Sequence, residues 1–494
     1  PDFSELDKQL LARGSLKEYK HHNFIPVSQR DGKIVVAFSN PLDRWARDAA
    51  SNLLGPDVLP VCITQKALQD AITAYEWGLN QKQTVVTDEN AIVDVVNKVL
   101  LDALRENASD IHFEPMKDRL RVRFRCDGSL VRYKDFQLSL APAITSCIKV
   151  LASADIAEKR RHQDGRIMFE DQQNGFTIDV RASIYVTIHG EKIVLRLLSK
   201  KGELLNLKEI GMTPRILERF RNDALDVPSG VVIITGPTGS GKTTTLYSSI
   251  NYLNNPHTSI ITAEDPVEYV IDSITQCSIN PKLNVTFEET LRHILRQDPD
   301  VIVLGEIRDR FSAETAIQVA LTGHKVLTTF HTEDSIGALL RLLHMDIEAF
   351  LISSTVVCVV AQRLLRRVCS NCAEPDRPTA TDLRRLGYTS ETLRGAHFQV
   401  GRGCPQCRFS GYRGRTSIFE LLVLNEPVKD AIASRKTSHE IRRISLETSG
   451  LVTLLEDGIV KAAQGETTLQ EVLHHLPRVH NPRPISQLQR LLGR

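Results

Sequence analysis

A glycine-rich segment near the middle of this 494-residue chain has the composition of a phosphate-binding loop. Residues 236–243 match the pattern G-x4-G-K-[ST] at every position. Glycines let backbone N–H groups close around phosphate oxygens, and a following helix adds a favourable dipole. Lys242 is expected to reach the β- and γ-phosphates, and the Thr243 hydroxyl to hold Mg²⁺. The residues expected to contact the nucleotide are Gly236, Pro237, Thr238, Gly239, Ser240, Gly241, Lys242, Thr243 and Thr244.

Two acidic positions complete the pattern of a nucleoside triphosphatase. The apolar residues 301–305 predict a buried strand that ends in Glu306, and residues 260–263 predict another that ends in Glu264. Because the carboxyl ends of parallel strands meet at one edge of a sheet, both carboxylates are expected near the γ-phosphate. The sequence does not decide which of them orients or deprotonates the attacking water. For the segment around Glu264, a plain polar loop is the alternative.

Two histidines flank a further apolar strand. His324 precedes residues 325–330 and His331 follows them. We expect His331 to sense the γ-phosphate, and His324 is a second candidate for that role. The alternative for each is a structural histidine whose ring is satisfied by hydrogen bonds.

Four cysteines form two C-x-x-C pairs, Cys369/Cys372 and Cys404/Cys407, with 31 residues between the pairs. Four thiolates in this pattern suit tetrahedral Zn²⁺, and the closed ligand set favours a structural site over a redox role. The remaining cysteines have apolar neighbours and are expected to be small core residues; they are Cys62, Cys126, Cys147, Cys277 and Cys358.

Composition excludes some functions. Lys and Arg total 62 against 60 for Asp and Glu, so the net charge of +2 argues against a nucleic-acid channel. The longest apolar candidate, residues 351–361, is too short to span a bilayer, and the polar start shows no secretory signal. The first residue, Pro1, suggests a truncated or processed chain. Paired cysteines in a chain of this size favour a reducing compartment.

The elements that must position these residues fall into three domains. Residues 1–78 mix strands and helices, residues 79–88 are a polar linker, and residues 89–200 begin with an amphipathic helix. A second linker is expected at residues 201–210. From residue 211 strands alternate with helices, which predicts a doubly wound parallel sheet.

Finer features are expected within these domains. A hairpin turns at Asp127-Gly128, and its polar face is more easily explained as a solvated sheet face than as a binding site. That face carries Arg121, Arg123, Arg125 and Arg132. Thr64 is expected to cap a helix, and the pattern is helical from Ser438 onward. The arginine-rich tail after Pro477 is expected to be a mobile, solvated end.

The motifs together resemble the assembly ATPases of type II secretion and type IV pilus systems, a branch of the secretion superfamily. The resemblance covers residues from about 89 to 475 and is carried by several motifs. They are residues 109–115 (SDIHFEP), 163–166 (QDGR), 187–192 (TIHGEK), 261–266 (ITAEDP), 305–309 (GEIRD), 323–332 and 411–415 (GYRGR). Glu333 and His162 depart from the family's usual Asn and Pro. No Arg-Leu-Gly repeat of the kind that binds a cyclic dinucleotide is present in residues 1–78.

The resemblance implies a RecA-like doubly wound ATPase domain, a PAS-like α+β middle domain and a small α+β N-terminal domain. It implies a homo-hexamer that uses ATP with Mg²⁺, contains Zn²⁺, and has Arg166 and Arg181 as arginine fingers from the middle domain. Such a motor is cytoplasmic and reaches the inner membrane through assembly-platform proteins, here through residues 1–78. A DNA- or effector-translocating ring of the same superfamily, and a non-hydrolysing scaffold, are the alternatives.

Overall fold

The structure is a computed structural model that describes residues 8–11, 13–30, 32–65, 67–69, 71–72, 89–171, 176–198, 205–389, 391–476 and 482–493. The chain forms two compact units. One contains Pro1–Asp171, Val180–Leu197 and Gly403–Ser410, and the other contains Gln172–Asp179, Leu198–Arg402 and Gly411–Arg494. The linker expected at residues 79–88 lies outside the described residues. Among the described helices, none combines the length and apolar character that a membrane span requires.

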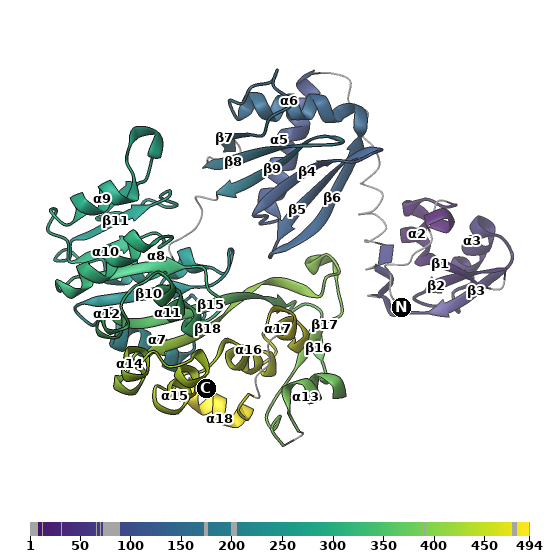
Figure 1. Cartoon of the computed structure of the whole chain (residues 1–494). Helices are drawn as coiled ribbons and strands as arrows, with labels where there is room; N and C mark the ends of the chain where they lie inside the picture. Colours follow the sequence, from purple (N-terminus) through teal and green to yellow (C-terminus); the bar gives the residue numbers. More distant parts are fainter. Residues whose placement is uncertain are drawn as a thin grey trace. The chain divides into compact units, whose positions relative to one another are not determined.

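The N-terminal part of the chain folds around a three-stranded sheet (Figure 1). Its elements are α1 (Lys8–Leu11), α2 (Leu16–His22), β1 (Phe24–Arg30), β2 (Lys33–Phe38), α3 (Arg44–Leu54) and β3 (Val58–Cys62). Tyr19, Phe24 and Phe38 are fully buried in its core. The predicted helix cap is confirmed, because Thr64 Oγ1 accepts a hydrogen bond from Ala67 N at 3.2 Å.

The middle of the chain forms a six-stranded sheet with strand order β6-β5-β4-β9-β8-β7. Its elements are α5 (Glu89–Arg105), β4 (Asp110–Pro115), β5 (Arg119–Cys126), β6 (Ser129–Gln137), α6 (Ala141–Leu151), β7 (Gln163–Asp171), β8 (Phe176–Thr187) and β9 (Gly190–Leu198). The predicted hairpin is confirmed, because Asp127 and Gly128 have φ of 50° and 86°, as the two-residue turn requires. The amphipathic helix is also confirmed: Val96 and Leu100 of α5 are buried.

The arginine face of this sheet is ion-paired rather than simply solvated. Arg121 Nε and Arg123 Nε each donate to Glu114 Oε2 at 2.9 Å, and Arg125 Nε lies 3.7 Å from Asp110 Oδ2. Burial alone would raise the pKa of Glu114, but the hydrogen bonds from these arginines and Lys192 lower it to about 2. The expectation of a solvated face missed these acids because they come from β4, a neighbouring strand.

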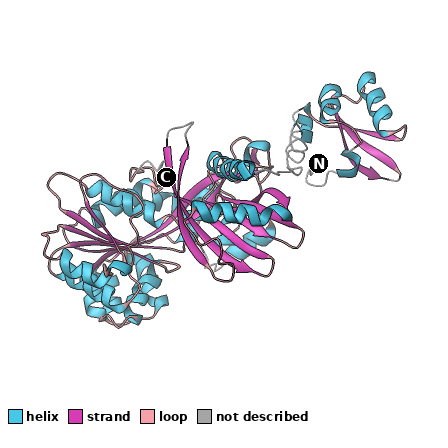
Figure 2. Cartoon of the chain, turned by 90° about the horizontal axis from the view of Figure 1, so that it is seen from above, coloured by secondary structure: helices cyan, strands magenta, loops and turns pink. Residues whose placement is uncertain are grey.

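The C-terminal half of the chain contains a seven-stranded sheet with strand order β12-β11-β13-β14-β10-β15-β18. The strands are β10 (Gly230–Thr235), β11 (Ile260–Glu264), β12 (Thr275–Ser278), β13 (Val301–Leu304), β14 (Lys325–Phe330), β15 (Val356–Val368) and β18 (Tyr412–Val423). The pairs are parallel except β15 with β18. Helices cover both faces, so the predicted doubly wound sheet is confirmed (Figure 2).

Helices on the two faces belong to different apolar clusters. The helices that precede the tetracysteine segment are α7 (Pro214–Phe220), α8 (Lys242–Leu253), α9 (Phe287–Ile294), α10 (Arg310–Leu321), α11 (Ser335–His344) and α12 (Ala349–Thr355). Ala313 and Leu339, from α10 and α11, pack in one cluster, while Phe220 and Leu246, from α7 and α8, pack in the other. Leu207 and Ile210, in the expected linker, are buried in the second cluster, so these two side chains attach the described part of that linker to the core.

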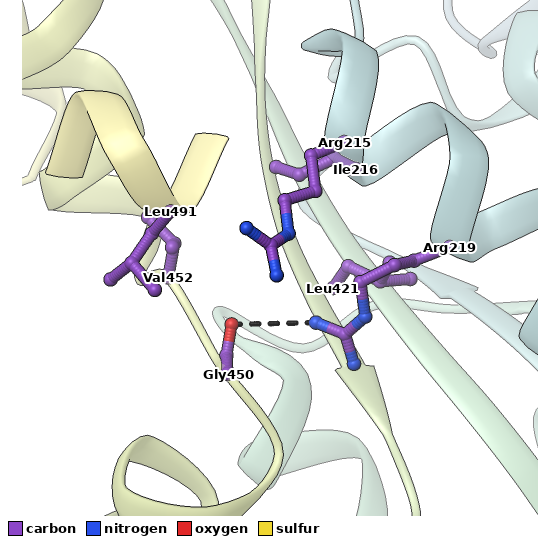
Figure 3. A pocket seen from close by; sticks show the side chains of 7 residues that line it. All are labelled: Arg215, Ile216, Arg219, Leu421, Gly450, Val452 and Leu491. Atoms are coloured by element: carbon purple, nitrogen blue, oxygen red, sulfur yellow. Dashed lines mark hydrogen bonds between the residues drawn. The ribbon is translucent and has the colours of Figure 1, made fainter. Parts of the chain in front are cut away.

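The C-terminal region adds two short strands and six helices within the described residues. They are β16 (Ala373–Pro375), α13 (Ala380–Leu386), β17 (Gln399–Gly401), α14 (Glu426–Ala433), α15 (Ser438–Thr448), α16 (Leu454–Ala463), α17 (Leu469–His475) and α18 (Ile485–Leu492). The expectation of a solvated tail is wrong for residues 482–493, because Leu488 and Leu492 of α18 are fully buried. Figure 3 shows Leu491 and Val452 facing Arg215 and Arg219 of α7 across a small cavity. The tail's Arg483 also pairs with buried Glu456, at 2.7 Å.

Candidate nucleotide and metal sites

The carboxyl ends of four neighbouring strands define the candidate nucleotide site. β14 lies between β10 and β13, and β11 is next in order. The segments that leave these ends carry the predicted residues: the phosphate loop follows β10, His331 follows β14, Glu306 follows β13, and Glu264 ends β11. A Cβ on Gly305 would lie 3.2 Å from the Cα of Glu264, so the ends of β13 and β11 are tightly packed.

The phosphate loop has the backbone that its glycines predict. Gly239 and Gly241 have φ of 77° and 89°, in the region that side chains disfavour. Helix α8 begins at Lys242, immediately after the loop. Pro237, Thr238 and Gly239 are exposed at the loop tip, as are Thr243 and Thr244 on the first turn of α8, whereas Gly236 and Ser240 are buried. The loop therefore presents its tip and both threonines to a ligand.

Lys242 is held by the loop itself. Its Nζ donates to the carbonyl oxygens of Gly236 at 2.8 Å and Pro237 at 3.2 Å, and it lies 3.4 Å from His331 Nδ1. Burial lowers the pKa of Lys242 to about 8, and the charge of Glu306 opposes that shift. The ammonium group is thus partly buried, and phosphate oxygens of a ligand can replace the carbonyl oxygens of Gly236 and Pro237 as its hydrogen-bond acceptors.

His331 and Glu306 continue this chain of polar contacts. His331 Nε2 lies 3.2 Å from Glu306 Oε2, so the imidazole ring bridges the lysine and the carboxylate. Arg308 pairs with Glu306 and also donates from Nη1 to Asp265 Oδ2 at 3.3 Å. The side chain of His331 is 52% exposed and that of Glu306 is 19% exposed, so both are open to an incoming ligand.

Glu264 is in a different environment. It is 4% exposed, and its carboxylate accepts hydrogen bonds from the Tyr247 hydroxyl, from Thr262 Oγ1 at 2.6 Å and from Gln276 Nε2 at 3.2 Å. Burial, together with the hydrogen bond to Glu264, raises the pKa of Tyr247. Glu264 is therefore anchored by neutral donors in the interior, whereas Glu306 is partly exposed beside His331.

His324 does not line this site. It lies before β14, at the amino end of the strand, while His331 follows the carboxyl end. Its Nδ1 is 2.9 Å from Thr322 Oγ1 and 3.3 Å from the carbonyl oxygen of Val319. A sensor role for His324 at the loop of its own chain is therefore wrong, because a six-residue strand separates it from the loop.

Two buried polar residues support the site without having been predicted. Gln362 of β15 contacts the phosphate loop through Ser240 O. Glu420 of β18 accepts from Ser335 N at 3.0 Å, at the start of the helix that follows the His331 loop, and burial raises its pKa. Neither residue stands out in the sequence, because Gln362 is followed by Arg363 in β15 and Glu420 shares β18 with Thr416 and Ser417.

The predicted arginines lie in the middle of the chain, Arg166 on β7 and Arg181 on β8, which are neighbouring strands. Arg166 is exposed and Arg181 is partly exposed. Gly165 sits against the end of α6: a Cβ there would lie 2.3 Å from the carbonyl oxygen of Ala152. Arg166 N donates to the same oxygen at 3.3 Å, so this contact fixes the backbone from which Arg166 projects.

The four paired cysteines come together as predicted. The sulfur atoms of Cys369, Cys372, Cys404 and Cys407 all lie within 4.8 Å of one another. Tetrahedral Zn²⁺ with bonds of about 2.3 Å requires thiolates about 4 Å apart, so the cluster fits this metal. The backbone around it is close-packed, because a Cβ on Gly401 would lie 2.0 Å from Gly411 O.

The remaining cysteines follow the core expectation only in part. Cys126 and Cys358 are buried, and Cys147 and Cys277 are partly buried. Cys62 is exposed, which contradicts the expectation, because it lies at the end of the edge strand β3.

Comparison with known proteins agrees with this geometry. The family model described as Type II/IV secretion system protein matches residues 85–474, and the MshEN domain model matches residues 1–78. The chain belongs to the type II/IV secretion system protein family. It is 39% identical to type II secretion system protein E of Xanthomonas campestris, over 93% of this chain and 84% of that protein. It is 42% identical to the type IV pilus assembly ATPase PilB of Thermus thermophilus, over 78% of this chain but only 43% of that protein.

Solved structures show the same fold. The ATPase DotB of Legionella pneumophila superposes with a TM-score of 0.57 at 21% identity, covering 78% of this chain and 95% of that chain. The pilus retraction motor PilT with bound ADP gives a TM-score of 0.51 at 23% identity, covering 78% of this chain and 97% of that chain. The part of the chain that contains the seven-stranded sheet is thus RecA-like. Membership of the type II/IV secretion system protein family, with relatives at 42% identity that are named ATPases, identifies the chain as an ATP-hydrolysing enzyme.

The lowered pKa of Lys242 predicts pH-dependent nucleotide binding. Above about pH 8 the free protein holds a neutral lysine, which must take up a proton to bind phosphate as an ammonium ion. We expect the Kd for Mg-ADP, measured by calorimetry, to rise by up to about tenfold for each pH unit above 8. Lys242→Arg should bind more weakly but show a flat profile, because its guanidinium stays charged. A flat profile for the unaltered chain would contradict the prediction.

Proposed function

We propose that this ATPase drives the assembly of a pilus or pseudopilus, in a type IV pilus or type II secretion machine. The names of its relatives support this, since they are type II secretion proteins E and pilus assembly ATPases at 37–45% identity. The contacts from Lys242 through His331 to Glu306 support the proposal, because these three side chains lie at one sheet edge and suit the roles of phosphate ligand, sensor and acid. The proposed domains are residues 1–78, 89–200 and 211–494.

The proposed reaction is in-line attack of water on the γ-phosphate. Lys242 exchanges the loop carbonyls for phosphate oxygens, and the loop N–H groups bind the remaining phosphate oxygens. Mg²⁺, when bound at Thr243, supplies positive charge beside the β- and γ-phosphates. His331, released from Lys242, is placed to donate to the γ-phosphate. Each of these interactions stabilises the charge that builds up during phosphoryl transfer.

Glu306 is the proposed base, and Glu264 is a supporting residue. Glu306 is partly exposed and lies beside the proposed sensor, whereas three donors occupy Glu264 in the interior. A general base needs a free lone pair within hydrogen-bonding reach of water. Glu264 instead holds Tyr247 of α8 against β11, which keeps the helix behind the loop in place. The four cysteines are proposed to hold a structural Zn²⁺.

Arg166 and Arg181 are the proposed arginine fingers of a hexameric ring. Two guanidinium groups on adjacent strands suit the transition-state charge of the transferring phosphoryl group. Residues 1–78, which match a separate family model, are proposed to recruit the motor to platform proteins at the inner membrane from the cytoplasmic side.

Substitution of Glu306 tests the assignment of the base. Glu306→Gln should bind Mg-ATP with near-normal affinity but lose turnover by about 10² or more, because an amide cannot accept the proton. Phosphate release and nucleotide titration measure the two effects. The matched control is Glu314→Gln, a surface carboxylate paired with Arg310 Nε at 2.6 Å, which should hydrolyse ATP normally. Near-normal hydrolysis by Glu306→Gln would refute the assignment.

A concentration series tests the ring. Phosphate release per subunit should climb with protein concentration, because the active site is completed only in the assembled ring. Arg166→Ala should lower kcat by about 10² or more and still form the ring. The control Arg132→Ala removes an exposed arginine whose Nε lies 3.2 Å from Asp135 Oδ1, and it should leave turnover unchanged. Activity that is substantial and independent of concentration would count against the ring.

Deletion of residues 1–78 tests recruitment. The shortened chain should hydrolyse ATP but no longer co-float with membranes that contain the platform proteins, because it lacks the residues proposed to bind them. The full chain with Lys242→Ala, which disables the phosphate loop, should still co-float. Co-flotation of the shortened chain would move the recruiting role to another domain.

A further inference from the structure

Gln362 is fully enclosed beside the phosphate loop, with 1% of its surface exposed. It lies on β15, which is paired with β10, the strand that leads into the loop. Its Nε2 donates to Ser240 O at 2.7 Å, and its Oε1 accepts from Thr245 Oγ1 at 2.6 Å. One side chain therefore connects the loop to the first turn of α8.

The chemistry of its partners fixes the orientation of the amide. Ser240 O can only accept a hydrogen bond, so the NH₂ group of Gln362 has to face it. This leaves Oε1 toward Thr245, whose hydroxyl can donate. Thr245 also donates its backbone N–H to Gly241 O at 3.1 Å, so the same threonine secures both the amide and the loop.

Fixing the carbonyl of Ser240 also fixes the N–H of Gly241, because the two groups belong to one peptide plane. In a trans peptide they point in opposite directions. With its C=O held toward β15 by Gln362, this peptide directs the Gly241 N–H away from β15, where a bound phosphate can accept from it. An unrestrained peptide beside a glycine can rotate, since glycine tolerates many backbone conformations.

Two glycines of the loop pack directly against Gln362. A Cβ on Gly241 would lie 2.9 Å from Gln362 Nε2, and a Cβ on Gly236 would lie 2.4 Å from Gln362 O. The loop therefore contacts Gln362 at its first glycine, at the Ser240 carbonyl and at its last glycine. No other polar side chain among the described residues donates to Ser240 O.

We propose that Gln362 is a positioning residue for ATP binding, which aligns the Ser240–Gly241 peptide so that the Gly241 N–H faces the phosphates. The proposal rests on the proposed function, in which this loop binds ATP. Glutamine is suited to the role because it donates and accepts at the end of one side chain. Glutamate of the same length cannot donate to a carbonyl, and methionine can do neither.

The test uses the full chain loaded with zinc and compares Gln362→Met, Gln362→Glu and Thr245→Val. The Kd for Mg-ADP should rise about tenfold in Gln362→Met, equivalent to about 1.4 kcal/mol, and further in Gln362→Glu, which adds negative charge near the phosphates. KM for ATP should rise with it, while kcat at saturation changes less. Thr245→Val keeps the shape of the side chain and should raise the Kd by a smaller factor. This variant still tests the proposal if the Gln362 variants do not fold. Gln318→Met, on the exposed face of α10, is the control.

The outcomes separate this proposal from its alternatives. Unchanged Kd and KM in folded Gln362 and Thr245 variants would overturn it while leaving the ATPase assignment intact. A lowered melting temperature with unchanged Kd would show a purely structural role and would also overturn it. An unaltered chain that binds neither ADP nor ATP would instead overturn the proposed function itself. A raised Kd that is not increased further when Thr245→Val is added to Gln362→Met would support the proposal.

Discussion

A partly buried ammonium group needs hydrogen-bond acceptors and a compensating charge, and this need organises the nucleotide site. Lys242 meets it with two loop carbonyls and with His331, which in turn contacts Glu306. The arrangement depends on strand order. Because β14 lies between β10 and β13, the residue that follows it falls between the lysine and the acid. The polar chain is thus a consequence of sheet topology as much as of the residues themselves.

The sequence predicts the parts of the site that are contiguous along the chain. The loop, the acid after β13 and the histidine after β14 each sit beside an apolar strand, and the parallel sheet brings them to one edge. Gln362 and Glu420 escape such reasoning because their partners, Ser240 and Ser335, are far away in sequence. Both strands also carry other polar residues, such as Arg363 in β15 and Ser417 in β18, so the sequence does not single out either residue as buried.

The incorrect expectations have separate physical causes. His324 and His331 adjoin the same strand, but opposite ends of a strand lie at opposite edges of a sheet. The arginines of the tail indicate a solvated end, but Ile485, Leu488 and Leu492 at helical spacing pack it against the core. The apolar neighbours of Cys62 indicate a core position, but its strand is at the edge of the sheet. In each case the missing information was the position of an element within the fold.

The backbone contact between Gly401 and Gly411 limits how this family member can evolve. A Cβ at either position would strike the carbonyl oxygen of the other, at 2.0 Å or 2.3 Å. Neither residue can shrink further to make room, so no substitution at one site is compensated by a change at the other. A side chain at either position therefore requires the two backbone segments to move apart, and with them the four cysteines that the segments carry.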